Sequence, residues 1–98
     1  MKKSDIVNKI SDKTGIEKVL VTACIHGFMN SVMEIMEGGE NVYLRGFGTF
    51  VIKERKAKTG QNIKRGIAVE IPAHCVARFK PSKTFAIRVK KGVSPKGR

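Results

Sequence analysis

The chain has 98 residues, 41% of them hydrophobic, which suits one small globular domain. It carries 20 Lys and Arg against 8 Asp and Glu, a formal net charge of +12, so composition favours a polyanionic partner: DNA, RNA or an anionic membrane surface. The charged N-terminus lacks the apolar core of a signal peptide and no run of about 18 apolar residues occurs, so we expect a cytoplasmic protein that does not cross a membrane.

A first helix is predicted over residues 3–14, with Ser4 as its N-cap and Gly15 as its stop. A second is predicted over residues 17–37, ended by Gly38 and Gly39. At 100° per residue, eight side chains of this helix fill one apolar arc: Val21, Cys24, Ile25, Phe28, Met29, Val32, Ile35 and Met36. So wide a face predicts a dimer built on the second helix, with Phe28 and Val32 in its core; a monomer core is the alternative.

The next segment predicts a small antiparallel sheet. Residues 42–45 alternate in polarity, residues 46–48 supply a tight turn, and residues 49–52 resume a strand. Residues 53–71 predict a basic two-stranded ribbon without a core of its own, which we expect to be mobile until it meets a partner. Residues 75–80 predict a third strand with Phe79 facing inward.

A third helix is predicted over residues 83–91, with Ser82 as its N-cap and Gly92 as its stop, before a basic tail at 92–98. The predicted fold class is therefore α+β: two N-terminal helices, a three-stranded antiparallel sheet with a long β-ribbon arm, and a C-terminal helix. We expect one domain over residues 1–91. It divides into a helical dimerisation half (1–40), the sheet with its arm at about 53–71 (41–81), and the C-terminal helix (82–91).

Catalytic and metal-binding patterns are missing from the sequence. It has no phosphate loop, no H-E-x-x-H and no CxxC, so we expect no enzyme, no cofactor and no small-molecule substrate. Cys24 lies in the apolar arc and is expected to be buried, while His26 points about 200° away from it, so the two cannot share a metal ion. His74 and Cys75 are adjacent in a strand and face opposite ways. Free thiols are expected, with a single disulfide as the alternative.

Three features suit a nucleic-acid duplex. The ribbon carries a row of cations with few carboxylates: Lys53, Arg55, Lys56, Lys58, Lys64 and Arg65. The first and third helices begin beside Lys3 and Lys83, where free backbone N–H groups favour phosphate. Ile63 stands alone at the polar ribbon tip. It can wedge between base pairs in the minor groove or, alternatively, fold back on Ile67 or Val69.

At these residues the chain resembles a known family. The segments GFGTF (46–50), RKAKTGQN (55–62), EIPA (70–73) and FKPSK (79–83) are similar, without gaps, to the bacterial histone-like proteins HU and the related integration host factor. The resemblance covers about residues 1–91. It implies an intertwined dimer whose two arms embrace the minor groove of bent DNA.

The resemblance also implies site residues. The positions that match the arm are Arg55, Lys58, Gly60, Gln61 and Asn62. Those that match the body contacts are Lys3, Gly46, Phe47 and Lys83, and those that match the aromatic dimer core are Phe47, Phe50 and Phe79. One departure stands at the tip, where the family has Arg-Asn-Pro and this chain has Gln61-Asn62-Ile63; another is Ile67-Ala68, where relatives carry polar or acidic residues.

We therefore expect a nucleoid-associated, architectural DNA-binding protein that is non-sequence-specific or weakly specific, bends and compacts duplex DNA, and forms a homodimer, with a heterodimer as the alternative. Two other functions stay open at this point. One is a sequence-preferring DNA-bending protein like integration host factor, and the other is an RNA-binding module. Tyr43 and the phenylalanines are expected in the core, so the ribbon has no aromatic side chain for stacking on unpaired bases, which disfavours RNA binding.

Overall fold

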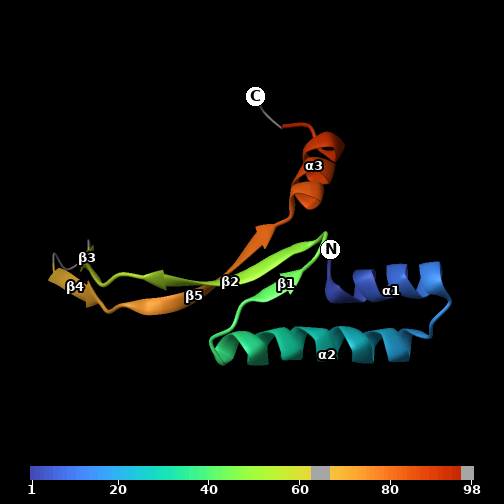
Figure 1. Cartoon of the computed structure of the whole chain (residues 1–98), viewed down its shortest axis with the longest axis horizontal. Coiled ribbons are helices and arrows are strands. Elements are labelled where there is room, and N and C mark those ends of the chain that lie inside the picture. Colours follow the sequence, from blue (N-terminus) through green and yellow to red (C-terminus); the bar gives the residue numbers. More distant parts are fainter. Residues whose placement is uncertain (63–66, 96–98) are drawn as a thin grey trace.

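A computed structural model gives the fold (Figure 1). It describes residues 1–62 and 67–95, with residues 60–62 and 67–69 described by their backbone pairing alone. The elements in chain order are α1 (Lys3–Thr14), α2 (Lys18–Glu37), β1 (Val42–Leu44), β2 (Gly48–Arg55), β3 (Lys58–Asn62), β4 (Ile67–Ile71), β5 (His74–Pro81) and α3 (Lys83–Gly92). The predicted α+β fold with its arm and C-terminal helix is confirmed, although interruptions divide the arm and sheet into five strand segments.

The helices begin and end close to their predicted bounds. α1 matches its prediction, but its N-cap is Lys2 rather than Ser4, and the Asp5 carboxylate accepts a hydrogen bond of 2.8 Å from the Lys2 backbone N–H. Ser4 lies inside the first turn. α2 ends where the Gly38–Gly39 pair was expected to end it, and Gly39 has a φ of 94°, in the left-handed region where glycine meets no Cβ penalty.

The central sheet has the strand order β1–β2–β5, antiparallel throughout. Asn41 extends its short edge strand, since the Asn41 side-chain oxygen accepts a hydrogen bond of 2.9 Å from the Ile52 N–H. The pairing of β2 with β5 runs from Gly48 opposite Pro81 to Arg55 opposite His74. The first residues of the expected ribbon, 53–55, therefore belong to the central sheet.

The ribbon beyond Arg55 continues the same register after a break. β3 pairs with β4 from Lys58 opposite Ile71 to Asn62 opposite Ile67. This register places Ala57 opposite Pro72, between the two ladders. Proline has no N–H to donate, so the ladder is interrupted where Pro72 stands, and one long hairpin is divided into two paired segments (Figure 1).

Four phenylalanine rings form the one aromatic cluster of the described chain. Phe79 lies between Phe47, Phe50 and Phe85, with ring centroids 5.2, 4.9 and 5.8 Å away, and Phe47 is also 5.2 Å from Phe85. Gly48 makes this packing possible, because a Cβ there would lie 2.5 Å from Phe79 Cζ and 2.7 Å from the Lys80 carbonyl oxygen. The turn, the sheet and α3 thus meet at one aromatic contact point.

A single chain leaves most of its apolar surface uncovered. Val7 and Val21, 5% and 4% exposed, are the only buried hydrophobic side chains among the described residues. The chain exposes 8808 Å², whereas a folded monomer of 10.8 kDa exposes about 5,500 Å². The radius of gyration is 19.0 Å against about 13 Å for a compact domain of this length. Cys24, expected to be buried, is exposed because the apolar face of α2 has no cover within its own chain.

α2 is also long and apolar enough to cross a membrane, when judged by length and composition alone. The expectation that no segment reaches that threshold was therefore too strong. The core helix of a soluble protein passes the same test, and α2 packs against α1, β1 and β2.

Replacing Gly48 by alanine should destabilise the protein by about 1–3 kcal/mol, because the added methyl meets the Phe79 ring and rigid backbone. Thermal unfolding at fixed protein concentration measures the effect. Gly27→Ala in α2 is the matched control, since a Cβ there meets nothing within 4 Å, and it should leave stability unchanged or raise it. Equal melting temperatures for Gly48→Ala and wild type would contradict the close packing.

Candidate nucleic-acid interface

The predicted arm cations lie along the ribbon in the order the sequence suggested. Lys53 and Arg55 end β2, Lys56 lies at the interruption and Lys58 begins β3, and all four side chains are exposed. Gly60, Gln61 and Asn62 continue β3, opposite residues 67–69. Ile63, Lys64 and Arg65 lie outside the described residues, so the wedge and the two tip cations stay predictions.

The outer face of the sheet extends this row of cations. Alternation along β2 puts Thr49, Val51, Lys53 and Arg55 on the face opposite Phe50 and Ile52. The register places Lys80 opposite Thr49 and Arg78 opposite Val51, so both cations share that face. The sequence analysis did not identify Arg78 and Lys80. Side chains alternate between the two faces along β5, and once the pairing of β5 with β2 is known this alternation places both residues on the outer face.

Tyr43 joins the same outer face. It pairs with Thr49, is 73% exposed, and lines a shallow hollow together with Arg45 and Lys80. The expectation that Tyr43 lies in the core was wrong, because in a three-residue edge strand the inward positions go to Val42 and Leu44. The outer face therefore carries an aromatic ring among its cations.

The body residues Gly46, Phe47 and Lys83 come together through Ser82. The Ser82 hydroxyl donates to the Gly46 carbonyl at 3.0 Å, and the Ser82 N–H donates to the Phe47 carbonyl at 2.9 Å. The same hydroxyl accepts from the Phe85 N–H at 3.1 Å, which confirms Ser82 as the N-cap of α3. The β1–β2 turn, where Gly46 has a φ of 81°, is thereby fixed to the start of α3, and Lys83 lies beside it.

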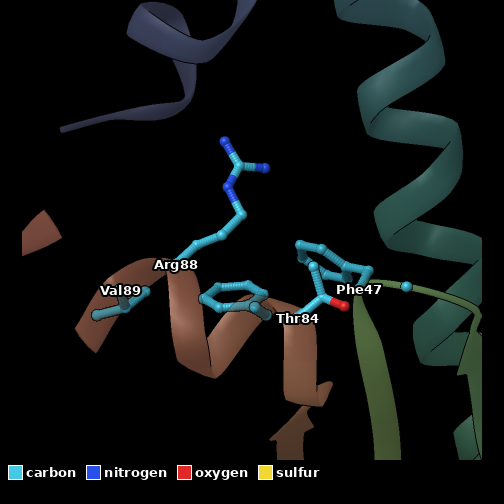
Figure 2. A pocket seen from close by; sticks show the side chains of 6 residues that line it. Phe47, Thr84, Arg88 and Val89 are labelled. Atoms are coloured by element: carbon cyan, nitrogen blue, oxygen red, sulfur yellow. The ribbon is translucent and has the colours of Figure 1, made fainter. Parts of the chain in front are cut away.

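Figure 2 shows the hollow between this turn and α3. Phe47 and Phe85 contribute the aromatic part of its lining, and Thr84 and Val89 line it from α3. The Arg88 guanidinium extends above it (Figure 2). Phe47 is thus part of the aromatic cluster, although it is 45% exposed in the single chain, so its place in the dimer core and its body contact both stay predictions. Phe85 is a cluster member that sequence analysis did not single out.

Lys3 lies elsewhere in the single chain. It begins α1 and contacts the ring of His26 on α2. The arm lies at the opposite end of the sheet from the turn and α3 (Figure 1). Of the predicted set, one chain brings together Gly46, Phe47 and Lys83 through Ser82 and aligns the ribbon cations.

The other four expected core residues lie in two different places. Phe50 and Phe79 contact each other, whereas Phe28 and Val32 line a groove of about 570 Å³ between α2 and the inner face of the sheet. Apart from Glu37, its lining is apolar or sulfur-containing and comes from three elements: Phe28, Met29, Val32, Met33 and Met36 of α2, Phe50 and Ile52 of β2, and Cys75, Val76 and Ala77 of β5.

Comparison with known proteins bears on this arrangement. The family described as bacterial DNA-binding protein matches residues 1–90. DNA-binding protein HU of Geobacillus stearothermophilus is 36% identical over 90 residues, which are 92% of this chain and 100% of that protein. The chain belongs to this family. Integration host factor subunit alpha of Anaeromyxobacter dehalogenans is another relative, 31% identical over 96% of this chain and 83% of that protein.

Among solved structures, an Anabaena HU–DNA cocrystal structure matches with a TM-score of 0.86 at 34% identity, covering 91% of this chain and 97% of that one. The resemblance that the sequence motifs suggested is confirmed by both kinds of similarity. The family fold agrees with the observed order of two helices, antiparallel sheet with an extended ribbon, and C-terminal helix.

Ser82→Ala should lower the free energy of unfolding by about 1–2 kcal/mol, because it removes a helix N-cap and the hydrogen bond to Gly46. Ser4→Ala is the informative control. Ser4 was predicted as a cap from the sequence, but the structure places it within the helix, so its replacement should change stability by less than about 0.5 kcal/mol. Chemical denaturation of both variants gives the comparison; a larger loss in Ser4→Ala would contradict the observed caps.

Proposed function

We infer that the protein is an architectural DNA-binding protein that bends and compacts duplex DNA as a dimer, without strong sequence selectivity. The observation that carries this inference is the exposed cationic ribbon, continuous with a cationic outer sheet face, in a chain of the HU family. Phosphate contacts from such a surface supply affinity that does not depend on sequence.

The dimer follows from the uncovered apolar surface. Each chain exposes about 3,000 Å² more than a folded monomer of its mass, and the groove between α2 and the sheet is lined almost entirely by apolar groups. Obligate dimer interfaces have this size and character. A second copy that inserts apolar side chains into the groove and against the aromatic cluster would complete the core, with residues 1–40 as the dimerisation half.

The DNA is held at two places. The arms carry Lys53, Arg55, Lys56 and Lys58 toward the groove edges, where ammonium and guanidinium groups neutralise phosphates on both sides. The backbone of Gly60 allows close approach at the minor groove, with Gln61 and Asn62 beside it. The body adds Lys3, Gly46, Lys83 and the outer-face cations Arg78 and Lys80, which hold the flanking duplex.

Bending is assigned to the arm tips. Ile63 at each tip supplies an apolar side chain of sufficient size to unstack one base step, in place of the family's proline. Isoleucine lacks the fixed φ of proline, so its entry into the stack orders a freer side chain and backbone.

A second candidate is a sequence-preferring DNA-bending protein, supported by the relative named integration host factor subunit alpha. Affinities for random and selected duplexes at one salt concentration separate the two: a ratio near one favours the HU-like function. The exposed ring of Tyr43 is the one structural observation that favours RNA binding, and a competition between duplex DNA and duplex RNA tests it.

We also propose that the protein is soluble, lies in the cytoplasm in association with the nucleoid, and has no enzymatic activity.

Binding to a duplex of random sequence should weaken steeply with salt. If a dimer neutralises about ten phosphates, the slope of log K against log salt concentration should lie near −9. Lys58→Ala, which removes one arm cation per chain, should reduce the steepness by about 2 in a dimer. Fluorescence anisotropy across a salt series measures both. A slope near zero for wild type would overturn phosphate neutralisation as the source of affinity.

Ile63→Ala should preserve most of the affinity for linear duplex, because the phosphate contacts remain, but should reduce the bend. Energy transfer between dyes at the two duplex ends measures bending directly. Lys58→Ala serves as the opposite control, with weaker affinity and a normal bend once saturated. An unchanged end-to-end distance in the saturated Ile63→Ala complex would remove the wedge.

A further inference from the structure

The outer face of the central sheet carries an aromatic side chain that faces water. Tyr43 lies in the middle of the edge strand β1 and is 73% exposed, more than any of the phenylalanines. The aromatic cluster and the apolar groove both lie on the inner face of the sheet, so neither the single chain nor the proposed dimer interface covers the Tyr43 ring. Packing therefore does not account for an aromatic residue at this position.

The polar end of the Tyr43 ring is held by a neighbouring side chain. The Asn41 side-chain oxygen accepts a hydrogen bond of 2.9 Å from the Ile52 N–H, which fixes the side-chain amide. The nitrogen of the same amide donates to the Tyr43 hydroxyl at 3.4 Å. A ring that is positioned at its hydroxyl end and otherwise exposed loses little freedom when a flat ligand stacks on it.

The strand register places a hydroxyl and an ammonium group in line with this ring. Tyr43 pairs with Thr49, and Thr49 pairs with Lys80, so the three side chains form one row across the outer face of β1, β2 and β5. Adjacent strands are about 4.8 Å apart, so the two ends of the row are separated by about 10 Å at the backbone. Arg45 and Lys80 line the same shallow hollow as Tyr43, and no carboxylate is among the described residues that line it.

An aromatic ring beside cations on an exposed sheet face suits an unpaired nucleotide. The base stacks on the ring, and ammonium and guanidinium groups neutralise the neighbouring phosphates. Every base has a flat face, so this kind of binding tolerates different sequences. In a duplex the bases are already stacked on each other and are not available to a protein ring, so Tyr43 favours single strands.

We propose that the outer face of the sheet is a binding platform for single-stranded DNA, on which Tyr43 stacks on an unpaired base while Arg45 and Lys80 hold the adjacent phosphates. The platform goes beyond the bending of duplex DNA by the arms. The choice of DNA over RNA rests on the proposed function. The cations of the outer face continue along β2 as Lys53 and Arg55, so DNA that is held by the arms reaches the platform along one surface.

The fluorescence of Tyr43 gives a direct test, because the chain has one tyrosine and no tryptophan. Titration of the full-length protein with oligothymidine should quench the tyrosine emission as a base stacks on the ring. Free tyrosine at the same DNA concentrations corrects for light that the DNA absorbs. A duplex of equal length should bind with much less quenching. Unchanged tyrosine emission in a saturated complex with oligothymidine overturns the platform.

Substitutions of Tyr43 separate stacking from a structural role. Fluorescence anisotropy with labelled oligothymidine should show roughly tenfold or weaker binding by Tyr43→Ala, with duplex affinity changed less than about twofold. Tyr43→Phe keeps the ring and loses only the hydroxyl, so it should bind oligothymidine within about twofold of wild type. Wild-type affinity of Tyr43→Ala for oligothymidine, or an equal loss of both affinities in this variant, contradicts stacking.

The cations and the kind of strand are tested in the same way. Lys80→Ala should lower the slope of log K against log salt concentration for oligothymidine by about 0.7 for each occupied site. Lys13→Ala, an exposed cation in the last turn of α1, should leave that slope unchanged. Equal slopes for Lys80→Ala and wild type would remove Lys80 from the platform. Quenching by oligouridine but not by oligothymidine would overturn the assignment to DNA. Absence of duplex binding by wild type overturns the proposed function instead, and quenching by oligothymidine would still support the platform.

Discussion

α2 carries more apolar surface than the other elements of its own chain cover. The helix packs on α1 along one narrow strip, where Val7 and Val21 are buried, and contacts the start of the sheet at its C-terminal end. The rest of its apolar arc faces an open groove. Burial at roughly 25 cal/mol per Å² makes a surface of this size the largest available source of stability, and a second chain is the means of using it.

In the proposed dimer, which forms through the helices, the outer face of the sheet stays free to bind a ligand. Phe50 and Phe79 pack against each other on its inner face, so the alternation of β2 and β5 turns Lys53, Arg55, Arg78 and Lys80 outward together. The same strands continue into the arm without a change of register. Core packing and the cationic surface are therefore two faces of one pair of strands.

The fold could be predicted from the sequence because its signals are local. Helix periodicity, the glycine stops after α1 and α2, and the Ser82 cap each act within a few residues, and the helices were placed to within one residue at every end. The predicted stop at Gly92 was one residue early, because α3 includes Gly92 and its C-cap is Val93. The N-cap of α1 was misplaced because an Asp5 carboxylate supports Lys2, which is no standard cap residue. Long-range features were harder. The exposure of Cys24 and Tyr43 depends on which chain covers which face, and the alignment of Arg78 with the arm depends on strand register.

The interruption at Pro72 has a mechanical consequence. β2 pairs with β5 at all eight positions from Gly48 to Arg55, and this paired segment begins at the aromatic cluster. We therefore expect it to resist bending. Beyond it, the unpaired step at Ala57 and Pro72 is the weakest point against bending and twisting. In the proposed complex, a load that curved DNA applies to the arm would therefore be taken up at this joint before it reaches the aromatic cluster. The arm would follow grooves of different curvature without a change in the rest of the chain.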